Sequence, residues 1–169
     1  MNFKYFLNDL DESVKTTVQP KTKDELKKII EDTINEQGNN CDLNFIDTSL
    51  IKDMSAMFSE SNFNGDISKW NVSKVKDMTS MFKGSNFNGN ISKWNVSSVE
   101  TMENMFSGSV FNGDISKWNV SKVKNMECMF EFSKFNKDIS KWDVSSVKKM
   151  RRMFTRSQFE GNEPDWYKD

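Results

Sequence analysis

The sequence contains no histidine, only two cysteines, two prolines and two tyrosines, and no long hydrophobic run. Without histidine, Ser-His, Cys-His and histidine-ligated metal chemistry are excluded within this chain. A formal net charge of -1 removes the broad electrostatic surface expected of a general nucleic-acid or membrane-surface binder. The length of 169 residues fits one domain or one array of repeats.

Targeting signals are also missing from the sequence. No window approaches the ~20 apolar residues of a membrane span, so we expect no span. A secretory signal needs roughly 7–15 consecutive apolar residues, and Asp9, Asp11 and Glu12 interrupt the start of the chain. Cys41 and Cys128 lie in different copies of a repeat, and two free thiols fit a reducing compartment. These observations predict a cytoplasmic protein for the chain as given, or a cell-surface protein if a leader was removed.

The sequence is rich in phenylalanine, methionine and tryptophan, because one unit of 24 residues is repeated. The unit reads FNGDISKWNVSKVKDMTSMFKGSN and starts with Phe63. We therefore predict two regions, an N-terminal helical cap over residues 1–40 and a solenoid over residues 41–169. The copies comprise a degenerate one at 41–62, four full ones at 63–86, 87–110, 111–134 and 135–158, and a partial one at 159–169.

The second half of each unit has the spacing of one helical face, with apolar residues at i, i+3, i+6 and i+7. These residues are Val75, Met78, Met81 and Phe82 in the first full copy. With Ser73 as N-cap and Gly84 as stop, this pattern predicts a short helix from about 74 to 83, and the next copy adds a capping box at Ser97 and Glu100. The first half, DISKWNV, favours a short strand or extended turn.

Copies of such a unit must stack, because a single coil cannot bury its own apolar face. Extended edges stack about 5 Å apart and helices about 10 Å apart, so we predict a curved α/β solenoid with the helices on its convex side. The repeated aromatic and methionine side chains should form the core, although a tryptophan row could instead stack on sugars or bases. The core ladder comprises Trp70, Trp94, Trp118, Trp142, Met78, Met81 and Phe82.

The two ends of the array differ in sequence. Thr22 and Glu25 form a capping box for a helix that ends at Gly38 and carries an apolar stripe of Leu26, Ile29, Ile30 and Ile34. A second amphipathic helix is predicted before it, from the spacing of Phe3, Phe6, Leu10 and Val14. At the other end, Trp166 and Tyr167 follow Pro164. This end is either loosely covered or meets another chain, as in a homo-oligomer.

Positions that differ between copies are the candidates for partner binding, since stacking does not dictate them. Phe132 replaces a glycine of earlier copies and places an aromatic ring at an exposed loop. Cations gather in the fourth full copy, at Lys148, Lys149, Arg151, Arg152 and Arg156. They fit a solvated face, a docking site for an acidic protein, or a less favoured nucleic-acid patch. The Asp66, Asn90, Asp114 and Asp138 row fits turn capping better than calcium binding.

The pattern D-I-S-x-W-[ND]-[VT]-S-x-V-x-x-M-x-x-M-F, preceded by P-K-T-K-D-E-L and I-D-T-S, resembles the BspA-like repeats. These are related to leucine-rich repeats and also occur in mycoplasma lipoprotein-associated proteins, a domain class of unknown function. The resemblance runs from Pro20 to Asp169. It implies a leucine-rich-repeat-like solenoid that binds other proteins, often on bacterial or protist surfaces. It carries over no catalytic or cofactor residues.

We therefore expect a non-catalytic protein-binding module with no cofactor and no metal. Repeated Asp or Lys residues do not make the unique site that an enzyme needs. The partner class stays open between an adhesin-type surface role and an intracellular protein that neutralises a toxin or effector.

Overall fold

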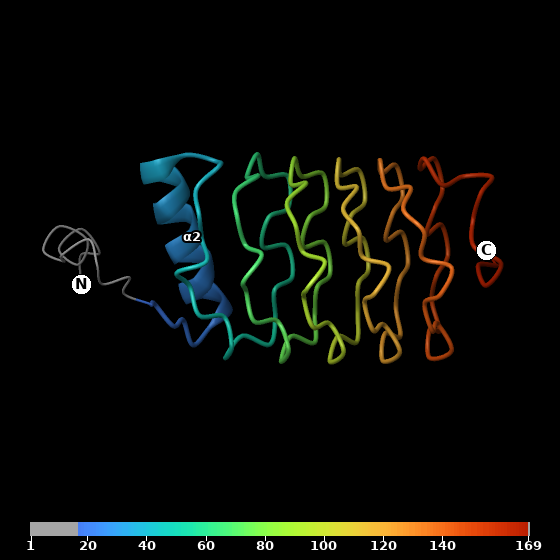
Figure 1. Cartoon of the computed structure of the whole chain (residues 1–169), viewed down its shortest axis with the longest axis horizontal. Helices are drawn as coiled ribbons and strands as arrows, with labels where there is room; N and C mark the ends of the chain where they lie inside the picture. The colour runs from blue at the N-terminus through green and yellow to red at the C-terminus, as the bar shows by residue number, and fades with distance from the viewer. Residues whose placement is uncertain (1–16, 169) are drawn as a thin grey trace, which may run out of the picture.

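A computed structural model describes residues 17–168, in which each copy of the repeat forms one coil (Figure 1). The coils lie side by side along one axis, with helix α2 beside the first coil and the C-terminus at the far end. The helix predicted over Phe3, Phe6, Leu10 and Val14 lies outside the described residues. Within residues 17–168, no helix has the length and hydropathy needed to span a membrane.

Helix α2 spans Lys23–Gln37, which confirms the helix predicted before the repeats. The Thr22 hydroxyl accepts from the Glu25 N–H at 3.2 Å, while the Glu25 carboxylate accepts from the Lys21 N–H at 2.6 Å. The chain leaves the helix at Gly38, whose φ of 84° suits glycine. Leu26 and Ile30 are buried against the first coil, so α2 covers one end of the stack.

Neighbouring coils are joined by backbone hydrogen bonds that run from one coil to the next. Between the first two full copies, alternate N–H groups donate to carbonyl groups 23 residues later. The bonds are Met78 to Thr101 at 3.1 Å, Ser80 to Glu103 at 2.8 Å, Phe82 to Met105 at 2.9 Å and Gly84 to Ser107 at 2.7 Å. Parallel bridges follow the same column, joining Asp53, Asp77, Thr101, Asn125 and Lys149 in turn.

The short helix predicted in each copy is wrong, because residues 74–83 form consecutive turns. The Met81 N–H donates to the Met78 carbonyl at 3.2 Å, and the Lys83 N–H donates to the Ser80 carbonyl at 3.1 Å. Ser80 has φ 56°, in the left-handed region that a right-handed helix does not use. Since the Phe82 N–H is bonded to the next coil, it is unavailable for a helix. The three-residue spacing of the apolar positions is therefore the period of the turns.

The helix-capping roles predicted around this segment are wrong as well. The Ser73 N–H donates to the Asn71 side-chain oxygen at 3.1 Å, so Ser73 belongs to a turn. The Glu100 carboxylate binds lysines of other coils rather than the Ser97 backbone. Gly84 does have a positive φ, 61°, but within the turns and not at the end of a helix.

The half predicted to be extended also consists mainly of turns, such as the Trp70 N–H donating to the Ile67 carbonyl at 3.1 Å. Its parallel bridges within residues 17–168 join Asp42 to Asp66 and Val18 to Ile46, whereas the long bridged column lies in the other half. The wider helical edge that was expected to curve the stack is therefore absent from the described coils. In the view of Figure 1 the coils run alongside one another without fanning out.

The core consists of side-chain columns that run the length of the stack. Phe58 stacks on Phe82 at 5.5 Å between ring centroids, and the column continues through later copies at similar distances. Each tryptophan N–H donates to a carbonyl of the preceding coil, as from Trp94 to Ile67 at 3.1 Å. The structure therefore places inside the stack Trp70, Trp94, Trp118, Trp142, Met78, Met81 and Phe82. Buried indoles offer no open ring face to a sugar or a base.

Candidate functional site

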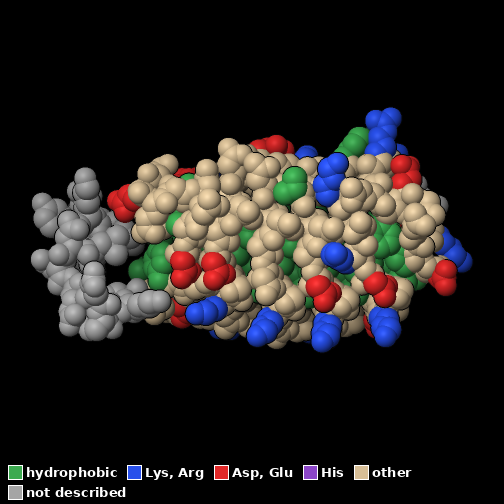
Figure 2. Space-filling model, turned by 45° about the horizontal axis from the view of Figure 1, so that its top comes forward, with side chains coloured by type: hydrophobic (Ala, Val, Ile, Leu, Met, Phe, Trp, Pro, Cys, Tyr) green, Lys and Arg blue, Asp and Glu red, His purple; other side chains and the backbone are tan. Residues whose placement is uncertain are grey.

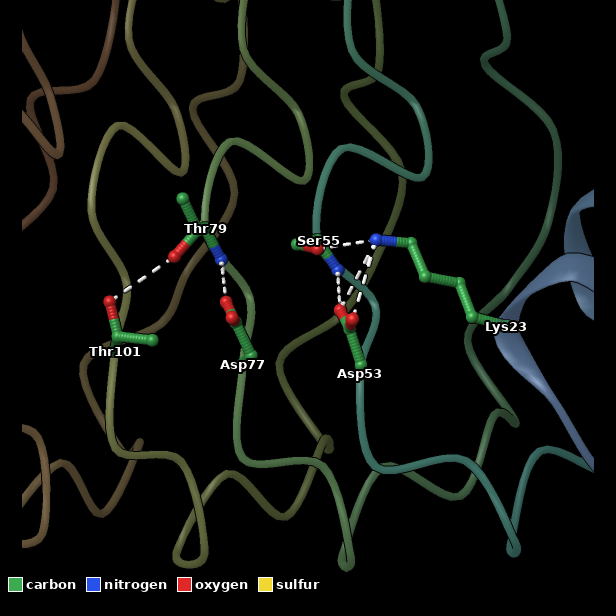
Figure 3. A network of polar contacts seen from close by, with 6 residues as sticks. All are labelled: Lys23, Asp53, Ser55, Asp77, Thr79 and Thr101. Atoms are coloured by element: carbon green, nitrogen blue, oxygen red, sulfur yellow. Dashed lines mark hydrogen bonds and ion pairs between the residues drawn. The ribbon is translucent and has the colours of Figure 1, made fainter.

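The variable residues gather on one surface, which we call the turn face. It is formed by the stacked turn segments 52–60, 76–84, 100–108, 124–132 and 148–156. Equivalent residues of successive copies form columns along the stack. Figure 3 shows one such neighbourhood, where Lys23 of α2 reaches Asp53 and Ser55 of the first coil, and Thr79 contacts Thr101 of the next coil.

Phe132 lies on the turn face and is 48% exposed, the largest value among the exposed large hydrophobic residues of 17–168. Its column contains Glu60, Gly84, Gly108 and Arg156, and all members have positive φ. Phe132 itself has φ 58°, which costs a non-glycine residue on the order of 1–2 kcal/mol. A Cβ added at Gly108 would have only Gly84 backbone atoms within 4 Å, the nearest at 3.8 Å. The surface next to Phe132 in this column therefore has room for another group.

The structure divides the predicted cation cluster into three surroundings. The Arg156 guanidinium lies over the Phe132 ring, 5.5 Å from its centroid, which is a cation–π arrangement. Arg152 forms an ion pair with Glu131 of the preceding coil. Lys148 lines a surface depression, while Lys149 and Arg151 are exposed between these groups. In Figure 2, exposed hydrophobic and basic atoms adjoin at the upper rim toward one end of the stack.

Glu131 and Cys128 form a small polar group beneath the exposed side chains. Glu131 is only 7% exposed, and its Oε1 lies 2.5 Å from the Arg152 guanidinium, which compensates the buried charge. Burial and, to a smaller extent, a hydrogen bond with Glu131 together raise the pKa of the Cys128 thiol to about 11. A thiol with this pKa is protonated at neutral pH and is a poor nucleophile.

The depression is lined by residues of three successive coils and carries mostly positive charge. Its volume is about 420 Å³. At one side Glu100 accepts from Lys124 at 2.7 Å and from Lys76 at 3.1 Å, and these two bonds lower the pKa of Glu100 to about 2. The other lining residues are Ser121, Lys122, Ser145, Ser146, Val147 and Lys148. The arrangement suits an anionic group of a ligand or partner.

The acidic and asparagine rows are used within the fold. Asp66 accepts from the Ser68 N–H at 2.8 Å, and this backbone bond is the main cause that lowers the pKa of Asp66. The Asn88 N–H donates to the Asn64 side-chain oxygen at 2.8 Å, and later copies repeat this contact. Among residues 17–168, no three cysteine or carboxylate side chains are placed together to hold a metal ion.

The sequence predicts Phe132 and the cations as candidate residues, but it does not reveal two other features of the same surface. Aligning the copies could have suggested the Glu131–Arg152 pair, since the two columns lie 21 residues apart and are adjacent in space. The sequence has no comparable signal for the depression. Ser145 and Ser146 are equivalent to serines of other copies, and only the residues that lie around them in space differ.

The family described as a Mycoplasma protein of unknown function, DUF285, matches this chain at residues 25–132 and 108–168. The two matches overlap in the third full copy and together include most of α2 and every full copy of the repeat. No curated protein and no solved structure matches the chain.

Proposed function

Because the chain belongs to the DUF285 family of Mycoplasma proteins, whose function is unknown, we propose a function from the features of the turn face. The protein is a non-catalytic protein-binding module. We further propose that the stack of coils is a leucine-rich-repeat-like solenoid of the BspA-like class. The partner binds the C-terminal half of the turn face, around Phe132 and Arg156. An extended repeat surface favours broad contact over a deep pocket.

The observation that carries this proposal is the Phe132 side chain. It exposes a large apolar ring on a backbone position where two other copies have glycine. Neither the exposure nor the positive φ contributes to stability, and a strained exposed aromatic residue is typical of a binding site. Arg156 holds the ring from one side, so the ring is partly ordered before a partner arrives.

The test compares the chain with its Phe132→Gly variant in affinity capture from Mycoplasma lysate, followed by quantitative mass spectrometry. Glycine is the residue of Gly84 and Gly108 at this position, so the variant should keep the fold. Leu50→Ser, which removes another exposed apolar side chain, is the matched control. We expect a captured protein that Leu50→Ser retains and Phe132→Gly loses at least tenfold. Equal recovery by all three proteins would refute the proposal.

Nucleic acid is the second candidate, because Lys122, Lys124 and Lys148 line one depression. Binding of this kind falls steeply with salt, by a log–log slope of about -0.9 per phosphate contact. A fluorescent single-stranded oligonucleotide titrated from low to high salt measures the slope. Absent binding at low salt would remove this candidate.

A further inference from the structure

The column that contains Phe132 has an unfilled position next to the exposed ring. Along the stack its members are, in order, Glu60, Gly84, Gly108, Phe132 and Arg156. Arg156 lies over one face of the Phe132 ring, and the next residue on the opposite side is Gly108. A Cβ added at Gly108 would have only backbone atoms within 4 Å, so no side chain of a neighbouring coil uses this space. We call the space the Gly108 gap.

A carboxylate lies on the far side of the Gly108 gap. The Glu60 side chain extends over the next coil, and its carboxylate occupies the space that a Cβ of Gly84 would need. Glu60 is exposed, and its carboxylate forms no ion pair with any residue of 17–168. The gap therefore lies between an aromatic ring and an unpaired negative charge.

The spacing of the coils sets the width of the gap. Neighbouring coils joined by backbone hydrogen bonds lie about 5 Å apart, so the Glu60 carboxylate above Gly84 and the Phe132 ring two coils later are about 10 Å apart. A cation–π contact extends to about 6 Å from the ring centroid. An ion pair extends to about 4 Å between nitrogen and oxygen. A single cation in the gap can therefore contact both groups.

The charge around the gap favours a cation over other occupants. The turn segment 100–108 contains Glu100 and Glu103 and no lysine or arginine. A phosphate or carboxylate group in the gap would lie beside the Glu60 carboxylate with no cation from its own segment. An uncharged aromatic ring could stack on Phe132, but it would leave Glu60 unpaired.

Arginine is the cation that this chain already places against the same ring. Arg156 is one coil beyond Phe132, and its guanidinium carbon lies 5.5 Å from the ring centroid. An arginine side chain above Gly108, one coil before Phe132, would make the equivalent contact with the opposite face. A guanidinium is planar, so it can stack on a ring while its N–H groups donate to a carboxylate. The two cations would be about 10 Å apart, beyond the Debye length of about 8 Å at physiological salt.

We propose that the Gly108 gap binds an arginine side chain of the partner protein, between the open face of the Phe132 ring and the Glu60 carboxylate. This inference rests on the proposed function, because it names the chemistry of a partner that binds at Phe132. The partner presents an exposed arginine to the middle of the turn face.

The chemistry of the gap is tested with N-acetyl-arginine amide, titrated into the full chain while the NMR shift of the Gly108 N–H is followed. N-acetyl-citrulline amide has nearly the same shape without the charge, and we expect a saturable shift with the arginine probe alone. Glu60→Gln and Phe132→Gly should each weaken binding at least about threefold. Glu36→Gln, which removes an exposed carboxylate of α2, should change nothing. Absent binding, equal binding of the two probes, or unchanged binding in Glu60→Gln would overturn the proposal.

The chain can also supply its own arginine to the gap. Gly108→Arg introduces the residue found at Arg156, which has φ 54° in the same column, so the variant should fold. It should no longer bind the arginine probe and should lose the captured partner at least about tenfold. Gly108→Ala adds only a Cβ and should retain both activities. Retention of both by Gly108→Arg would contradict an arginine site at this position.

The two proposals can fail separately in these measurements. A protein that Phe132→Gly loses but Gly108→Arg retains would overturn the arginine site and leave the proposed function standing. Equal capture by the parent and Phe132→Gly would refute the proposed function, whereas selective binding of the arginine probe would still support the site.

Discussion

The two ends of the stack are closed in different ways. At the N-terminal end, α2 buries Leu26 and Ile30 against the first coil, and Lys23 reaches Asp53 at 3.3 Å and Ser55 as well (Figure 3). At the C-terminal end, Trp166 and Tyr167 are only half-buried over the last coil. Neighbouring coils donate to each other in both directions, as the Met78 N–H does to Thr101 and the Glu100 N–H does to Lys76. The N-terminal end is covered by a helix, and the C-terminal end of the described residues by two half-buried aromatic side chains.

The largest expected effect on stability comes from disrupting the contact between α2 and the first coil. Leu26 is fully buried, so Leu26→Asp should lower the free energy of unfolding by at least about 3 kcal/mol. If α2 detaches, the apolar face of the first coil that Leu26 and Ile30 cover is exposed, and self-association should increase as concentration rises. Urea unfolding and sedimentation velocity measure the two outcomes.

Asn35→Asp is the control for that experiment, since it introduces the same residue at an exposed position of α2. It should leave both stability and mass unchanged. A monomeric Leu26→Asp variant with the stability of the parent would show that α2 does not cap the stack.

A smaller effect should distinguish an interior tryptophan from the terminal one. Trp142→Phe removes a buried N–H bond to Ile115 of 3.1 Å and leaves a cavity, which should cost about 2–4 kcal/mol. Trp166 makes the same bond to Ile139 at 3.3 Å, but it is half-exposed, so Trp166→Phe should cost less than about 1 kcal/mol. Equal losses in urea unfolding would mean that the C-terminal end is as well covered as the interior.

The surface charge pairs between the middle coils should make stability depend on pH. The bonds from Lys124 and Lys76 hold the Glu100 pKa at about 2, below its usual value of 4.5. A lowered pKa contributes stability above the unfolded value, and that contribution is lost as pH falls from about 4.5 toward 2. Glu100→Gln should therefore be less stable than the parent at pH 7 and indistinguishable from it near pH 2. A difference in urea midpoint that is the same at both pH values would contradict this cause.

The smallest effect on stability is expected at Phe132. Phe132→Gly removes the strain of a positive φ but adds freedom to the unfolded chain, so the two changes nearly cancel, within about 1 kcal/mol. Thermal unfolding measures the difference. A loss above about 2 kcal/mol would show that the ring packs within the fold, which would remove the main support for its binding role.

Much of the core could be predicted, because the 24-residue period alone determines which side chains stack into a column. Trp94 and Phe87 recur every 24 residues, and any stack of equal coils places such residues above their equivalents. Helix α2 was predictable for a different reason, since Thr22 and Gly38 are local signals that act before packing.

The path of each coil could not be predicted from the apolar spacing. Met78, Met81 and Phe82 fit a helical face and a series of turns equally well, and the choice depends on where the Ser80 and Phe82 N–H groups find acceptors. Those acceptors, Glu103 and Met105, lie in the next coil, so the decision is made by stacking. The same limit applies to the site, where Arg156 meets Phe132 only because neighbouring coils are in register.

The asparagine column requires every coil to have the same length. The Asn112 N–H donates to the Asn88 side chain at 2.8 Å, and the same contact recurs in the neighbouring copies, so a coil of a different length would break the match with both neighbours. Units can therefore be gained or lost only whole, and each one moves everything beyond it by about 5 Å along the axis. A lineage that duplicates or deletes a copy changes the separation between α2 and the Phe132–Arg156 pair in these fixed increments, without altering either feature.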